Sequence, residues 1–120
     1  MKHYLLLILP LIFLISSCYY DSQEDLYPQA GNCDTTNISY TSSIKPIIDQ
    51  YCVGCHNTSN PLGGIDLSTY DLCVQYGQEG SLYGSMLQNG TYSPMPKNSN
   101  KVDDCTLNKI QIWIDKGYPN

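Results

Sequence analysis

The chain has 120 residues, with six lysines, no arginine and 11 acidic residues, which give a formal net charge of −5 at pH 7. This balance excludes the basic face that a nucleic-acid-binding protein presents, so we expect no nucleic-acid partner. The length accommodates a single domain once the N-terminal segment is set aside.

Residues 1–17 have the composition of a bacterial lipoprotein signal peptide. A short basic start precedes an apolar run over residues 5–15, which is too short to span a membrane and has no polar face. The run leads into Ser-Ser-Cys at residues 16–18, which resembles the lipobox that precedes an acylated cysteine. We therefore expect an exported protein whose mature chain begins at a lipidated Cys18.

Residues 18–33 are predicted to form a flexible acidic tether. They show no apolar period and contain three acidic residues, a proline and a glycine. More than one acyl chain on Cys18 would make the membrane anchoring stable. The expected location is a bacterial membrane, with the outer membrane favoured, at its periplasmic or cell-surface face. The mature chain would carry five lysines against 11 acidic residues, a net charge of −6.

An amphipathic helix is predicted from about Ile44 to His56. Ser43 suits the N-cap, and Pro46 would then lie in the first turn, where no intrahelical hydrogen bond is lost. The apolar residues follow the helical spacing i, i+3, i+4, i+7, i+8 and i+11. They are Ile44, Ile47, Ile48, Tyr51, Cys52 and Cys55.

The strongest chemical signal is Cys52-Val53-Gly54-Cys55-His56. Two cysteines separated by two residues and followed at once by histidine form the pattern that attaches c-type haem. Cys52 and Cys55 would form thioethers with the two vinyl groups, and His56 would bind the iron as proximal ligand. One alternative is a zinc site, which needs more ligands than this one histidine and its neighbours offer. The other is a redox dithiol, which is expected beside a βαβ pattern that this sequence does not show.

The segment after the motif is predicted to be a loop followed by two short helices. Residues 57–64 are rich in Asn, Ser, Pro and Gly, which favours a loop. Residues 68–71 resemble a capping box and predict a short helix through about Tyr76, which Gly77 and Gly80 break. A second short helix is predicted over residues 81–88.

Met95 is the preferred distal ligand of the iron. The second face of a c-type haem commonly binds a methionine thioether. Met95 lies between Pro94 and Pro96, whose fixed φ angles stiffen the loop. Met86, the other methionine of the mature chain, has apolar helical neighbours and is predicted to fill the core instead. Ligation by two histidines of one chain is excluded, since His56 is the only histidine after the signal peptide.

A C-terminal amphipathic helix is predicted between Asp103 and Lys116. Aspartates in its first turn, a lysine in its last and Gly117 beyond mark both ends. Its apolar stripe consists of Leu107, Ile110 and Ile114, with Trp113 at the border. Trp113 is predicted either to donate its indole N–H to a haem propionate or to cover the edge of the core.

In this order of parts, the chain resembles a class I cytochrome c domain, and more narrowly the small single-haem cytochrome c-like lipoproteins of bacteria. The resemblance covers about residues 37–119. It implies an all-α, cytochrome c-like domain over residues 34–120, with amphipathic N- and C-terminal helices packed around the haem, and short helices and a Met-bearing loop between them. It also implies one covalently attached haem c and one-electron transfer. The residues that would hold the haem are Cys52, Cys55, His56 and Met95.

Three cysteines remain, namely Cys33, Cys73 and Cys105. Export permits a disulfide among them. In the fold that the resemblance implies, Cys33 and Cys105 each precede a terminal helix, so we expect these two to pair. Cys73 would then be a buried small residue.

The expected function is that of a membrane-anchored electron carrier and not of an enzyme, since no nucleophile with a base and no paired carboxylates are evident. The partner would be another redox protein, and the acidic surface would suit a basic one. We expect a monomeric domain. Two alternatives stay open: a haem-bearing docking subunit of a larger membrane redox complex, and a five-coordinate haem sensor or peroxidase.

Overall fold

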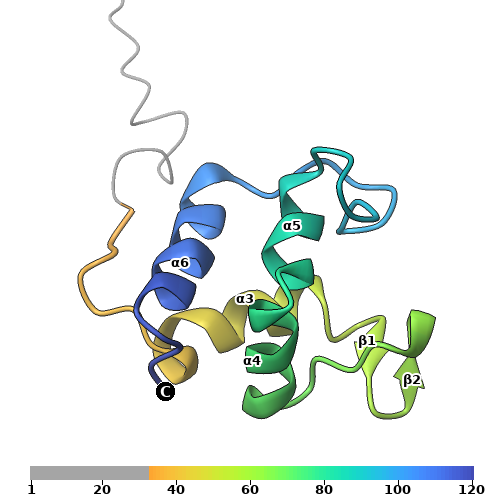
Figure 1. Ribbon diagram of the computed structural model, residues 1–120, viewed down its shortest axis with the longest axis horizontal. Helices are drawn as coiled ribbons and strands as arrows, with labels where there is room; N and C mark the ends of the chain where they lie inside the picture. Colours follow the sequence, from red (N-terminus) through yellow and green to blue (C-terminus); the bar gives the residue numbers. More distant parts are fainter. Residues whose placement is uncertain (1–32) are drawn as a thin grey trace, which may run out of the picture. The chain divides into compact units, whose positions relative to one another are not determined.

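The computed structural model describes residues 33–120, which form a mostly helical unit with one small sheet (Figure 1). The predicted signal peptide, lipidated Cys18 and nearly all of the predicted tether lie outside the described residues. The helical segments are the π-helix η1 (Tyr40–Ile44), α3 (Lys45–Tyr51), the 3₁₀ turn η2 (Leu62–Gly64), α4 (Tyr70–Gln78), α5 (Ser81–Leu87) and α6 (Asp104–Asp115). Antiparallel strands β1 (His56–Asn57) and β2 (Asn60–Pro61) lie between α3 and α4. The predicted predominance of helix is confirmed, but this sheet falls where the last residue of a helix and a loop were predicted.

The first helical segment begins earlier than predicted. Ser39 is its N-cap in place of Ser43, and the Ser39 hydroxyl accepts the N–H of Ser42 at 3.3 Å. Pro46 has no N–H, and in a regular α-helix its ring collides with the carbonyl one turn earlier. The wider π-helical turn η1 directly precedes α3 and leaves room for this ring.

The same segment also ends earlier than predicted, at Tyr51 and not at His56. Cys52 leaves the helical region of backbone conformation, with φ −121° and ψ −50°. The next two residues are Val53 and Gly54, and both have weak helix propensity. The Cys-x-x-Cys-His segment therefore follows the helix and does not belong to it.

The helix α4 runs through Gly77 to Gln78, so the prediction that Gly77 breaks it is wrong, whereas the predicted break at Gly80 is confirmed. Thr69 caps the start by accepting the N–H of Leu72 at 3.4 Å, and the chain turns only at Gly80, where φ is 78°. A side chain at Gly77 would place its Cβ 2.7 Å from Cε1 of Tyr118. Gly77 therefore allows α4 to pack closely against Tyr118 of the C-terminal tail. The local sequence does not reveal this contact.

The C-terminal helix α6 has the predicted ends. Asp103 caps it by accepting the N–H of Thr106 at 2.9 Å, and Gly117 follows it with φ 75°. Trp113, in contrast, is wholly buried at 0% exposure and does not border the stripe. Among residues 33–120 no helix is long and apolar enough to cross a membrane.

The core takes buried side chains from the first helical segment and from α4, α5 and α6. Within it, α6 packs against η1 and α5, and α5 packs against α4. The burial of apolar side chains in this core is the main source of stability in the unit. Five core residues are almost completely excluded from water. They are Ile44, Ile48, Cys73, Ile110 and Trp113.

The C-terminal tail closes the unit by joining both terminal helical segments. The carbonyl of Pro119 accepts the backbone N–H of Tyr40 at 2.7 Å and the indole N–H of Trp113 at 3.0 Å. The hydroxyl of Tyr70 donates to the carbonyl of Tyr118 at 2.7 Å, and the Tyr118 ring meets Trp113 edge to face. A few residues after α6 thus connect η1, α4 and α6.

A disulfide joins Cys33 to Cys105, which confirms the predicted pairing. It links the first described residue to the first turn of α6 and closes a loop 72 residues long. Cys73 is free and completely buried, also as predicted.

Candidate haem-attachment site

The Cys-x-x-Cys-His segment forms a hydrogen-bonded turn directly after α3. The carbonyl of Cys52 accepts the N–H of Cys55 at 3.0 Å and the N–H of His56 at 2.9 Å. These bonds retain one helical turn of spacing between the two cysteines although the helix has ended. The backbone therefore keeps both thiols and the imidazole within a single turn.

His56 is buried, with 9% of its surface exposed. It begins β1 opposite Pro61, and its carbonyl accepts the N–H of Leu67 at 2.9 Å. Its buried Nδ1 has no hydrogen-bond partner among residues 33–120. An unpaired buried polar atom costs about 1–3 kcal/mol, so this nitrogen has unused hydrogen-bonding capacity.

Asn57 braces the turn, a role that the sequence analysis missed. Its amide nitrogen donates to the carbonyl of Val53 at 2.7 Å. Its amide oxygen accepts the N–H groups of Ser59 and Asn60, both at 2.9 Å. An Asn that bonds the backbone two and three residues ahead is a local pattern, so the run Asn-Thr-Ser-Asn after the motif carried a signal for this turn.

The two motif thiols differ in their surroundings. Cys52 is partly buried, and this burial, with a smaller contribution from the neighbouring Cys73, raises the pKa of its thiol to about 12. Cys55 is exposed, and neither residue is in a disulfide. A redox dithiol attacks through a thiol whose pKa is lowered, so Cys52 is unsuited to that role. Two free thiols on one turn suit thioether formation.

The loop that carries Met95 is attached to the end of α5. The backbone N–H of Met95 donates to the carbonyl of Ser85 at 3.0 Å, and the carbonyl of Met95 accepts the side-chain amide of Gln88 at 3.2 Å. Both backbone polar groups of Met95 are therefore paired. Pro94 and Pro96, on either side, restrict the backbone further.

The two methionines of the described part differ as expected. Met86 is 3% exposed and belongs to the core, which confirms its predicted packing role. Met95 is half-buried, outside the core. Met95 is therefore the more exposed of the two methionines in residues 33–120.

The motif turn and the Met95 loop lie on the same side of the unit. In Figure 1, the sheet that follows the motif and the loop between α5 and α6 both project away from α6, toward the right of the view. The motif follows α3, whereas the Met95 loop follows α5. The fold thus brings two segments about 40 positions apart in sequence to a common side.

Trp113 does not belong to this site. Its indole N–H donates to the carbonyl of Pro119, and the whole side chain is buried in the core. The indole N–H is thus already paired within the protein, which leaves no hydrogen for a haem propionate. Of the two roles that the sequence allowed, the structure favours packing, deeper in the core than expected.

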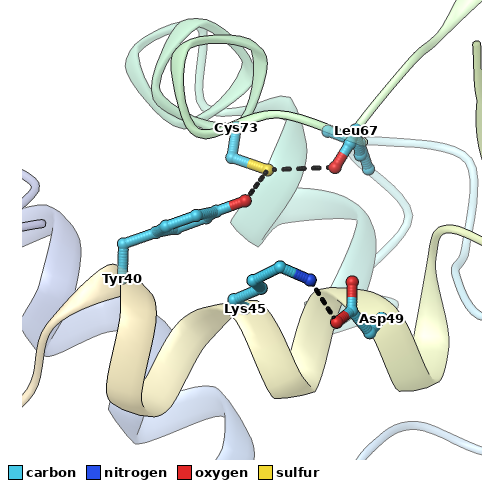
Figure 2. Close-up of polar contacts among 5 residues, drawn as sticks. All are labelled: Tyr40, Lys45, Asp49, Leu67 and Cys73. Atoms are coloured by element: carbon cyan, nitrogen blue, oxygen red, sulfur yellow. Dashed lines mark hydrogen bonds and ion pairs between the residues drawn. The ribbon is translucent and has the colours of Figure 1, made fainter.

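Cys73 connects the core to the backbone of the motif. Its thiol donates to the carbonyl of Leu67 at 3.3 Å, and the hydroxyl of Tyr40 lies 4.0 Å from the same sulfur (Figure 2). Leu67 in turn donates its N–H to His56. Burial raises the pKa of Cys73 to about 11, so this thiol is neutral at physiological pH.

The residues present fit a covalently bound haem. Two free thiols and a buried imidazole share one turn, and the loop that carries the half-buried Met95 projects toward the same side of the view in Figure 1 as the sheet that follows this turn. Among the described residues no three His, Cys, Asp or Glu side chains cluster as ligands of a metal ion. Haem iron does not require such a cluster, because the protein supplies only its axial ligands.

Comparisons of this chain with family models, with curated proteins and with solved structures find no match. The candidate site is therefore supported by the chemistry of its own residues alone. The spacing of Cys52, Cys55 and His56 is the strongest support, and the burial of His56 is the structural observation that accompanies it.

Proposed function

We propose that this protein is a single-haem c-type cytochrome that carries electrons one at a time and is anchored to a bacterial membrane through lipidated Cys18. The observation that carries the proposal is the Cys-x-x-Cys-His turn, in which the buried His56 shares one hydrogen-bonded turn with two free thiols. This combination is the donor set for covalent haem attachment and proximal ligation.

The arrangement of the helices supports a cytochrome c-like fold. In the family that the sequence resembles, the first and last helices pack across each other. Here η1 packs against α6, and the disulfide between Cys33 and Cys105 ties the same two ends together. Short helices and a methionine loop lie between them in the chain.

Each residue of the site has a distinct role in the proposal. The thiols of Cys52 and Cys55 would hold the haem through two thioether bonds, each formed when the S–H adds across a vinyl group. His56 and Met95 would be the protein ligands of its iron. The haem, when bound, would supply the one-electron chemistry.

The partner in this proposal is another redox protein. Asp and Glu outnumber Lys in the described residues, which suits a basic partner at long range. Residues 52–65 and 80–96, which hold the proposed ligands, contain no Asp, Glu or Lys. Net charge would therefore guide the approach of the partner, whereas contact near the haem would be made by uncharged side chains.

Covalent attachment is tested by isolating the protein from membranes and staining a denaturing gel for haem. We expect haem to remain with the polypeptide of the wild type. The double variant Cys52→Ala/Cys55→Ala should lose it completely, whereas Cys73→Ala should keep it. A wild-type protein that carries no covalent haem would refute the proposal.

Distal ligation is tested with absorption spectra of the ferric and ferrous protein. Met95→Ala should convert a six-coordinate, low-spin spectrum into one that responds readily to carbon monoxide. Met86→Leu, which keeps the volume of the buried side chain, should leave the spectrum unchanged. A wild type that already binds carbon monoxide readily would instead support a five-coordinate sensor or peroxidase. Purification only as part of a larger complex would support a docking subunit.

A further inference from the structure

We propose that Gln88 is the positioning residue of the distal side, because its side-chain amide holds the Met95 backbone against α5. This inference rests on the proposed function and identifies what keeps the methionine ligand in place. The amide nitrogen of Gln88 donates to two carbonyls of the loop, that of Met95 at 3.2 Å and that of Ser99 at 3.3 Å. One side chain therefore bridges two points of the loop that flank Pro96.

The backbone of Gln88 is arranged to make this bridge possible. Gln88 is the C-cap of α5 and has the left-handed conformation, with φ 51° and ψ 35°. Glycine and asparagine adopt this conformation far more easily than glutamine does. A glycine at position 88 would end the helix with less strain. The glutamine found there has a side chain long enough for its amide to reach the loop.

The end of α5 also holds Met95 through a backbone hydrogen bond. The carbonyl of Ser85 accepts the N–H of Met95 at 3.0 Å and also the N–H of Gln88 at 3.3 Å. Met95 thus has its N–H fixed by helix backbone and its carbonyl fixed by the Gln88 side chain. Only its thioether is left to bind another group.

The first half of the loop is held by Tyr92. Its ring lies so close to Gly84 on α5 that a Cβ there would overlap the ring. Its hydroxyl donates to the carbonyl of Glu79 at 3.3 Å. Tyr92 and Gln88 therefore secure the loop on both sides of Pro94, and Gln88 is the one whose side chain contacts the Met95 residue itself.

The test uses the haem-loaded wild-type chain and the variants Gln88→Gly and Gln111→Ala. Gln88→Gly removes the bridge but suits the left-handed backbone, so the helix end should still form. Gln111 donates a similar bond at 2.8 Å, but to Asp115 within α6, and its variant is the matched control. Imidazole is titrated into each ferric protein as a probe that competes with Met95 for the iron.

We expect imidazole to bind about tenfold more tightly to Gln88→Gly than to the wild type. The variant lacks the hydrogen bonds of Gln88 to the loop, and the loss of a hydrogen bond of ordinary strength changes an equilibrium by roughly this factor. Gln111→Ala should match the wild type. Equal imidazole affinity in the wild type and Gln88→Gly would overturn the role of Gln88 while leaving the cytochrome proposal intact. An equal rise of imidazole affinity in Gln88→Gly and Gln111→Ala would overturn it as well. A wild type without covalent haem would instead refute the proposed function, and this inference with it.

Discussion

The two sides of the described unit are held together in different ways. The side where the chain ends meet has the Cys33–Cys105 disulfide, the buried Trp113 and the carbonyl of Pro119, which accepts two hydrogen bonds. The side of the candidate site has neither a disulfide nor buried aromatic packing within residues 33–120. Its turn is held by hydrogen bonds, and its Met95 loop is held by hydrogen bonds and by the partly exposed Tyr92 ring on Gly84.

This difference separates the stability of the unit from the precision of its site. Covalent closure and apolar burial supply most of the free energy of folding. Individual hydrogen bonds contribute about 0.5–1.5 kcal/mol each, but they determine where particular atoms lie. Changes at the chain ends should therefore lower stability most, with little effect on the ligands, and changes at the loops should lower stability less while displacing the ligands.

The largest effect on stability is expected from removing the disulfide. Cys33→Ser/Cys105→Ser should lower the free energy of unfolding by about 4 kcal/mol, because the unfolded chain regains the entropy of a loop of this length. Urea denaturation of the haem-loaded protein measures the loss. The absorption spectrum of the folded variant should match the wild type, and a changed axial ligand would contradict the separation of the two sides.

A smaller effect concerns the pH dependence of stability through buried Cys73. Burial raises the pKa of its thiol to about 11 in the folded protein, above the pKa of a thiol in an unfolded chain. The folded state therefore holds this proton more tightly, so the stabilisation is complete below the unfolded pKa and is lost as pH rises toward 11. The loss should approach roughly 2–3 kcal/mol.

The measurement for Cys73 is the free energy of unfolding at pH 8 and at successive steps to pH 11. Cys73→Ala is the comparison, because it shares every other group that titrates in this range. The difference between the two proteins should shrink as pH rises. A constant difference would show that the Cys73 thiol does not titrate differently in the two states.

Gly84→Ala should disturb the Met95 loop. The new Cβ would overlap the Tyr92 ring, and the ring, which is partly exposed, would have to move. We expect a loss of about 1–2 kcal/mol, with the cost of overpacking partly offset by the better helix propensity of alanine. Gly54→Ala is the matched control, because a Cβ at Gly54 meets nothing within 4 Å. Equal stability of the two variants would mean that Tyr92 does not anchor the loop.

The smallest effect on stability is expected from Asn57→Ala in the motif turn. It removes hydrogen bonds to Val53, Ser59 and Asn60, at a cost of about 1 kcal/mol because water can replace some of them. The yield of covalently attached haem should fall by a larger fraction than the free energy of unfolding does. Asn60→Ala, a change of the same exposed hairpin, is the control, and a similar haem yield from both would remove Asn57 from the site.

Part of this fold could be read from the sequence because its determinants are close together in the chain. The ends of α6 follow from Asp103 and Gly117, which act on their immediate neighbours. The core position of Met86 followed from its apolar helical neighbours. The prediction for Gly77 was wrong because the reason for that glycine is the Tyr118 ring, about 40 residues away in the chain.

The sequence by itself determined the chemistry of the site: two thiols and an imidazole on one turn, and a methionine between two prolines. These depend on residue identity and on spacings of a few residues. The tertiary structure alone decided that His56 and Trp113 are buried, that Trp113 bonds to Pro119, and that Gln88 holds Met95. Burial and side-chain contacts of this kind depend on which distant segments pack together, and no local pattern specifies that packing.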